Sequence, residues 1–86
     1  ELISYINYGG WKNVNEMEVK EGDSVTFGPH PSNGDWHWEG PDGFTSDRRE
    51  ATVSNFNSQK AGEYIGTFTN AVGCRVELTI TLKLKK

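Results

Sequence analysis

Residues 34–44 read Gly-Asp-Trp-His-Trp-Glu-Gly-Pro-Asp-Gly-Phe and hold two of the chain's three tryptophans. Trp36 and Trp38 alternate with polar residues, and a period of two is typical of a β-strand with one dry face. The Gly-Pro-Asp-Gly sequence at 40–43 has strong turn chemistry. The stretch therefore predicts a strand that carries both indoles on one face and then enters a tight turn.

The same alternation recurs along the chain and is cleanest over residues 75–85, where every second side chain is aliphatic. Its predicted inward face consists of Val76, Leu78, Ile80, Leu82 and Leu84. Further strands are predicted over residues 2–8, 16–20, 24–27, 49–56 and 63–69. No window has a helical period, and turn signals recur about every 8 to 12 residues. We expect one all-β domain over residues 1–86, an antiparallel sandwich of about seven strands in two sheets.

A more specific pattern indicates an immunoglobulin-like sandwich. Residues 60–64 read Lys-Ala-Gly-Glu-Tyr, where such domains carry a tyrosine whose hydroxyl bonds back to the backbone. The second cysteine of their disulfide would come two residues after Tyr64, where this chain has Gly66. Cys74 is the only cysteine, so an internal disulfide is excluded. Trp38 is expected to be the core tryptophan of the fold, and aromatic and aliphatic packing must hold the core alone.

Composition excludes several classes of partner. Only 34% of the 86 residues are hydrophobic while 12% are aromatic, so a few large rings must supply much of the core. The net charge of -3 argues against nucleic acid and anionic membranes as partners. No apolar run approaches the roughly 20 residues of a membrane span. Because the chain begins at Glu1 rather than Met, we expect a mature product or a module of a longer protein. We also expect the chain to be a monomer.

The sequence predicts no catalytic activity. A glycosidase needs two carboxylates about 5–10 Å apart in a cleft, and an 86-residue sandwich has little chain left to wall one. No serine, histidine and aspartate arrangement has supporting context. Cys74 with two histidines falls short of a zinc site, and the loop aspartates lack the alternating spacing of a dedicated calcium site. We therefore expect neither a cofactor nor a metal site, although the composition allows a structural calcium ion.

The likeness to a known family extends over nearly the whole chain and is carried mainly by Trp-x-Trp-x-Gly-Pro-x-Gly-Phe at 36–44 and Ala-Gly-x-Tyr at 61–64. Tyr-Gly-Gly-Trp at 8–11 and Gly-Asp-Ser-Val-Thr-Phe-Gly-Pro at 22–29 add to it. The chain resembles small bacterial immunoglobulin-like modules appended to secreted polysaccharide-degrading enzymes. Several of these act as carbohydrate-binding modules. The resemblance implies an extracellular module, linked covalently to a glycoside hydrolase domain, that binds a β-linked plant or algal polysaccharide of the xylan or β-glucan type.

Sugar chemistry selects the candidate contacts. The axial C–H face of a β-linked pyranose stacks on an aromatic ring, and its hydroxyls pair with amides, carboxylates and arginine. Trp11 follows Gly9 and Gly10 in a polar stretch without apolar alternation, so we expect it to be exposed. For Trp36, a platform at the rim and a place at the core edge remain equally open. The predicted ligand-binding residues are Trp11, Trp36, Tyr8, Asn33, Asp35 and Arg49.

Three alternatives stay open at this point. Tyr5 and Tyr8 fall on opposite faces of a regular strand, so at most one of them faces a ligand. His37 and Glu39 project from the polar side of the tryptophan strand and could form a groove with Arg48 or Arg49, or could be ordinary exposed residues. Finally, the whole chain could be a structural or adhesive spacer in which all three tryptophans are packed or incidental.

Overall fold

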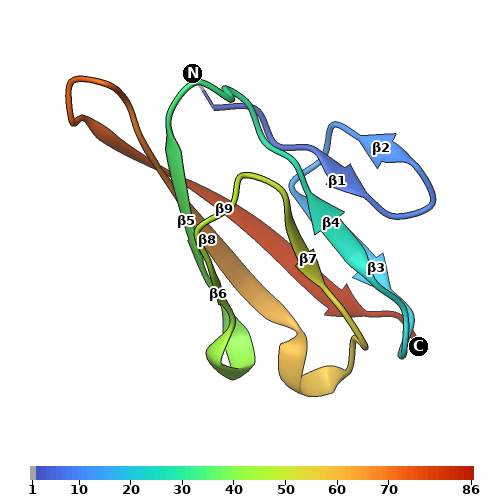
Figure 1. Ribbon diagram of the computed structural model, residues 1–86. Coiled ribbons are helices and arrows are strands. Elements are labelled where there is room, and N and C mark those ends of the chain that lie inside the picture. The colour runs from blue at the N-terminus through green and yellow to red at the C-terminus, as the bar shows by residue number, and fades with distance from the viewer. Residues whose placement is uncertain (1) are drawn as a thin grey trace.

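Two β-sheets packed face to face form the protein in the computed structural model, which describes residues 2–86 (Figure 1). The four-stranded sheet has the order β2-β1-β4-β7, with bounds Trp11–Lys12, Ile6–Asn7, Val25–Phe27 and Ala51–Val53. The five-stranded sheet has the order β3-β9-β8-β5-β6, with bounds Glu16–Val19, Arg75–Leu84, Gly62–Thr69, Asp35–Glu39 and Thr45–Ser46. Two short 3₁₀ turns, η1 (Pro41–Gly43) and η2 (Ser58–Lys60), complete the secondary structure.

The predicted all-β sandwich is confirmed, with differences in detail. Two short strands that the alternation did not reveal, β2 and β6, bring the described residues to nine strands. The pairing is antiparallel except between β3 and β9, which run parallel. The first strand covers Ile6–Asn7 instead of residues 2–8, but backbone hydrogen bonds from Ile3 to His30 continue its alignment toward the N-terminus.

The core lies between the sheets and is dominated by aromatic rings. Trp38 is fully buried on β5, and its ring centroid lies 5.0 Å from that of Phe27, which projects from β4 in the opposite sheet. Trp36 is 3% exposed and stacks beside Trp38 with an interplanar angle of 13°. Tyr64 on β8 packs edge-on against Phe27 and also against Phe44, which closes one end. The predicted role of Trp38 as the core tryptophan is confirmed.

Tyr64 also forms the corner that the sequence predicted. Its hydroxyl donates a hydrogen bond to the backbone carbonyl of Lys60 at 2.6 Å. Burial, with a smaller contribution from the charge of Asp42, raises the pKa of Tyr64 to about 12. The phenol therefore stays protonated and keeps donating across the physiological range, which fixes η2 to the start of β8.

A glycine takes the place of the missing disulfide. Gly66 on β8 pairs with Trp38 on β5, and a Cβ atom at Gly66 would lie 2.8 Å from the indole carbons Cη2 and Cζ3 of Trp38. That separation is well inside van der Waals contact, so the ring lies across β8 only because residue 66 has no side chain. In disulfide-bonded sandwiches the core tryptophan packs against the cystine, and here it packs against Gly66 instead.

The hairpin of β8 and β9 extends past the sandwich, and here one prediction is wrong. Val76 was expected to face the core, yet it is 51% exposed, and Val72 at the tip is 82% exposed. Figure 1 shows the hairpin projecting at the upper left, beyond the strands of the other sheet. An alternating strand buries its apolar face only where an opposing sheet covers it, so the alternation of β9 stops determining burial near Val76.

Candidate functional site

A short hairpin places Trp11 on the outer face of the four-stranded sheet. The chain reverses at Gly9 and Gly10, and the backbone amide of Gly10 donates to the side-chain oxygen of Asn7 at 3.1 Å. Trp11 then pairs with Asn7. Because Ile6 is buried in the core, its neighbour Asn7 faces outward, and the residue paired with it across the strands faces the same way.

The indole of Trp11 lies against backbone. A Cβ atom at Gly28 would sit 2.6 Å from Cη2 of Trp11, so the ring rests on a position without a side chain. Gly28 follows Phe27, which points inward, and therefore belongs to the outer face. Even so, 49% of Trp11 remains accessible to solvent. The ring is held on one side and open on the other.

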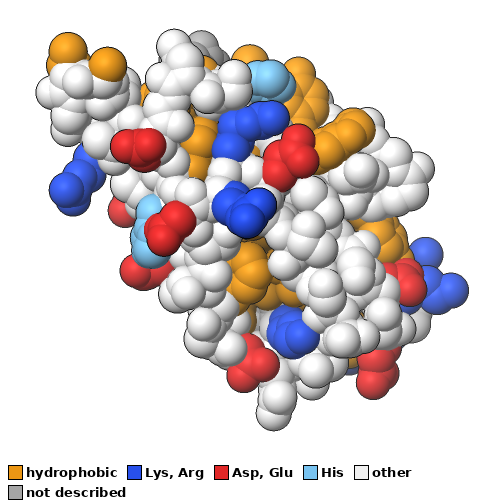
Figure 2. Space-filling model, viewed as in Figure 1, with side chains coloured by type: hydrophobic (Ala, Val, Ile, Leu, Met, Phe, Trp, Pro, Cys, Tyr) orange, Lys and Arg blue, Asp and Glu red, His pale blue; other side chains and the backbone are white. Residues whose placement is uncertain are grey.

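A hollow of about 300 Å³ opens beside the ring, and we call it the Trp11 hollow. Its lining residues are Tyr5, Trp11, Gly28, His30, Arg49 and Glu50. In Figure 2, hydrophobic atoms lie at the surface beside basic, acidic and histidine side chains over the region where Figure 1 places β1, β2 and β4. The hollow therefore combines aromatic surface with hydrogen-bonding groups, which is the composition of many small-ligand sites.

Paired backbone segments fix the aromatic wall of the hollow. The amide of Gly28 donates to the carbonyl of Tyr5 at 2.9 Å, and Ile3 and His30 exchange two further backbone bonds. The rings of Tyr5 and His30 meet edge to face, with centroids 5.3 Å apart. Since both residues are anchored through the backbone, this wall exists before any ligand arrives.

Arg49 and Glu50 supply the charged side of the hollow. The guanidinium of Arg49 donates from Nη1 to the carbonyl of Pro29 at 2.7 Å and lies with Nη2 3.4 Å from Oε2 of Glu50. These contacts hold the fork-shaped group in place. Of the predicted ligand-binding residues, the structure thus brings Trp11 and Arg49 together.

Trp36 is a correction. The sequence allows both a rim platform and a core edge for its ring, and the structure places the ring in the core, where Trp38 and Phe68 pack against it. Its Nε1 donates to the carbonyl of Pro31 at 2.9 Å. The prediction that Trp36 offers a ring face to a ligand is wrong, because its alternation with Trp38 puts both indoles under the opposing sheet.

The other predicted contacts lie outside the Trp11 hollow. Tyr8 donates from its hydroxyl to Asp23 at 2.6 Å, and this bond is the main cause that raises the pKa of Tyr8. Asn33 and Asp35 are exposed just before and at the start of β5, in the other sheet. None of the three lines the hollow.

Tyr5, His30, Glu50 and Gly28 were not among the predicted contacts. Tyr5 was the open alternative to Tyr8, and it is Tyr5 that faces the hollow. The signal was present in the alternation: Tyr5, Gly28 and Glu50 each lie next to a core residue at the end of a strand, and therefore on the opposite face. The sequence could not show that the segments carrying these residues lie side by side in the fold.

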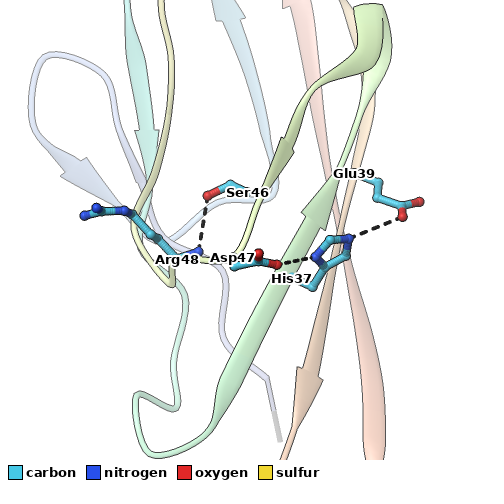
Figure 3. A network of polar contacts seen from close by, with 5 residues as sticks. All are labelled: His37, Glu39, Ser46, Asp47 and Arg48. Atoms are coloured by element: carbon cyan, nitrogen blue, oxygen red, sulfur yellow. Dashed lines mark hydrogen bonds and ion pairs between the residues drawn. The ribbon is translucent and has the colours of Figure 1, made fainter.

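The polar face of β5 holds a second cluster, shown in Figure 3. His37 Nδ1 lies 2.6 Å from Asp47, and Nε2 lies 3.3 Å from Glu39. Both hydrogen bonds raise the pKa of His37, and the bond to Asp47 is the larger cause. The side chain of Arg48 points away from the imidazole in Figure 3, and Arg49 lines the Trp11 hollow. The groove of His37 and Glu39 with an arginine is therefore not formed.

Residues 2–86 contain neither a cluster of metal ligands nor a helix suited to span a membrane. No three histidine, cysteine, aspartate or glutamate side chains in this range are grouped so that they could hold a metal ion. Within the same described range, no helix has the length and apolar character needed to cross a membrane. The Trp11 hollow combines a half-exposed indole with a tyrosine, a histidine and an adjacent arginine–glutamate pair, and we take it as the candidate site.

No protein-family model matches this chain, and no curated protein is significantly similar to it in sequence.

Proposed function

We propose that this chain is a non-catalytic carbohydrate-binding module of a secreted protein, and that it keeps a linked glycoside hydrolase domain close to a β-linked polysaccharide of the xylan or β-glucan type. The observation that supports it is the half-exposed indole of Trp11, held against Gly28 at the edge of a hollow that also contains Tyr5 and His30. A pre-fixed aromatic face beside hydrogen-bonding groups suits a pyranose ring.

The mechanism would be effective concentration. A weakly binding module tethered to an enzyme raises the local concentration of substrate without changing the chemistry of the active site. One open indole with flanking hydrogen bonds suits dissociation constants of about micromolar to millimolar. The module acts as a monomer, and polysaccharide and the linked domain are its partners.

Affinity electrophoresis in gels that contain xylan or β-glucan tests this function. The intact module should be retarded, and Trp11→Ala should migrate as it does in a gel without polysaccharide, because the stacking surface is gone. Val14→Ala is the matched control, since Val14 is also exposed and apolar but does not line the Trp11 hollow. Unretarded migration of the intact module across a broad panel of glycans would contradict the proposal.

Fluorescence quenching checks the geometry independently of any ligand. Acrylamide should quench one indole of the three, and Trp11→Phe should remove that accessible fraction, because Trp36 and Trp38 are buried. Quenching that disappears with Trp11 while no glycan retards the module would leave the structural spacer as the better interpretation. The burial of two of the three indoles is the observation that favours this second candidate.

A further inference from the structure

The charged residues at the rim of the Trp11 hollow bear on the charge of the ligand that it can bind. Arg49 and Glu50 are the two lining residues with formally charged side chains, and they lie side by side. The guanidinium is occupied at Nη1 by the Pro29 carbonyl and faces Glu50 at Nη2. Its positive charge is therefore opposed by an adjacent carboxylate, and the rim has no net formal charge to attract an anion.

The hydrogen-bonding capacity that remains on Arg49 and Glu50 suits the hydroxyl groups of a sugar. Arginine has five N–H donors, of which two are engaged here, and the side chain of Glu50 is 57% exposed. A sugar hydroxyl both donates and accepts, so neighbouring hydroxyls can accept from Arg49 and donate to Glu50. A uronate carboxylate only accepts, and in the hollow it would lie close to the like charge of Glu50.

From this arrangement we infer that the Trp11 hollow selects neutral glycan chains over uronate-bearing ones, and that Glu50 is the residue that sets this selectivity. The inference rests on the proposed function and narrows its substrate class. The net charge of -3 acts in the same direction, but it is spread over the molecule and is screened by salt more strongly than a charge in contact with the ligand. Like-charge contact is a general means of rejecting a wrong partner.

A matched pair of polymers tests the selectivity. Affinity for a neutral β-glucan is compared with affinity for the same β-glucan oxidised at C6 to glucuronate. The intact module should bind the oxidised polymer at least about tenfold more weakly at low ionic strength. Glu50→Gln should reduce this ratio to about threefold or less, because the repelling charge is removed and Arg49 loses its counter-ion.

Glu77→Gln is the control for overall charge. Glu77 is exposed on β9 in the other sheet and does not line the hollow, so its substitution removes one negative charge elsewhere. It should leave the ratio of affinities unchanged. An equal reduction by Glu77→Gln and Glu50→Gln would show a net-charge effect and overturn the role of Glu50.

The outcomes separate the inference from the function on which it rests. Equal affinity of the intact module for both polymers, lost in Trp11→Ala, would overturn the selectivity and leave the proposed function standing. An unchanged ratio in Glu50→Gln would likewise overturn it. Failure to bind either polymer, or binding that persists in Trp11→Ala, would overturn the function assigned to the hollow and the selectivity with it.

Discussion

Trp38 and Trp11 both lie across a glycine of a neighbouring segment, yet one is sealed and the other is open. A Cβ atom at Gly66 would come within 2.8 Å of Trp38, and one at Gly28 within 2.6 Å of Trp11. The difference comes from the opposing sheet: Phe27 covers Trp38 from across the core, whereas Trp11 stands on an outer face and stays 49% exposed. Packing on its own sheet orients an indole, and coverage by a second sheet buries it.

Truncation of each ring should have the largest effect and tests whether the buried and the exposed indole differ in their contribution to stability. Trp38→Ala should lower the free energy of unfolding by about 3–5 kcal/mol, because it removes a fully buried indole and leaves a cavity. Since domains have about 5–15 kcal/mol in total, partial unfolding at room temperature is an expected result for so small a core. Urea denaturation followed by circular dichroism measures the change.

Trp11→Ala is the matched case for the exposed ring and should change the free energy of unfolding by about 1 kcal/mol or less. Two comparable losses of stability would mean that Trp11 is a structural residue. The difference between open and sealed indoles would then have no functional meaning.

Substitution of Gly66, the glycine beneath the buried ring, should have a smaller effect on the free energy of unfolding. Gly66→Ala places a methyl group against Cη2 and Cζ3 of Trp38, and overpacking of this kind lowers the free energy of unfolding by about 1–3 kcal/mol. Thermal denaturation of Gly66→Ala beside Thr67→Ala, a neighbour on the outward face of β8, isolates the contact with the indole. If both variants melt at the same temperature, the close approach of Trp38 to Gly66 does not constrain the core.

The same comparison explains what could be predicted from the sequence. Alternation identified the strand of Trp36 and Trp38, and together with the spacing of turns it identified the two-sheet architecture. The motif at residues 60–64 identified the tyrosine corner. These are patterns of residues close together in the sequence. The Trp11 hollow depends on four parts of the chain meeting on one face: the segment before β1, the strand β2, the segment after β4 and the segment before β7. Only Trp11 and Arg49 could be selected from chemistry alone. Tyr5, His30 and Glu50 join them through strand pairing, which local patterns do not specify.

His37 gives the smallest expected effect and sharpens the contrast between the two faces of β5. It lies between Trp36 and Trp38 in sequence but points to solvent, where Asp47 and Glu39 raise its pKa. A raised pKa in the folded state means that the protonated imidazole stabilises the fold fully below the unfolded pKa of about 6.5, while the two carboxylates remain ionised. This contribution is lost as the pH rises through the higher pKa of the folded state.

An NMR titration of the imidazole of His37 should give a pKa above that of an unperturbed histidine. Asp47→Asn should move it back toward the ordinary value, whereas Asp42→Asn, the same charge change in η1, should leave it in place. An identical titration of His37 in wild type and Asp47→Asn would show that the contact with Asp47 is not formed in solution. The side chains on the polar face of β5 would then lack the fixed positions that packing gives to Trp36 and Trp38 on its other face.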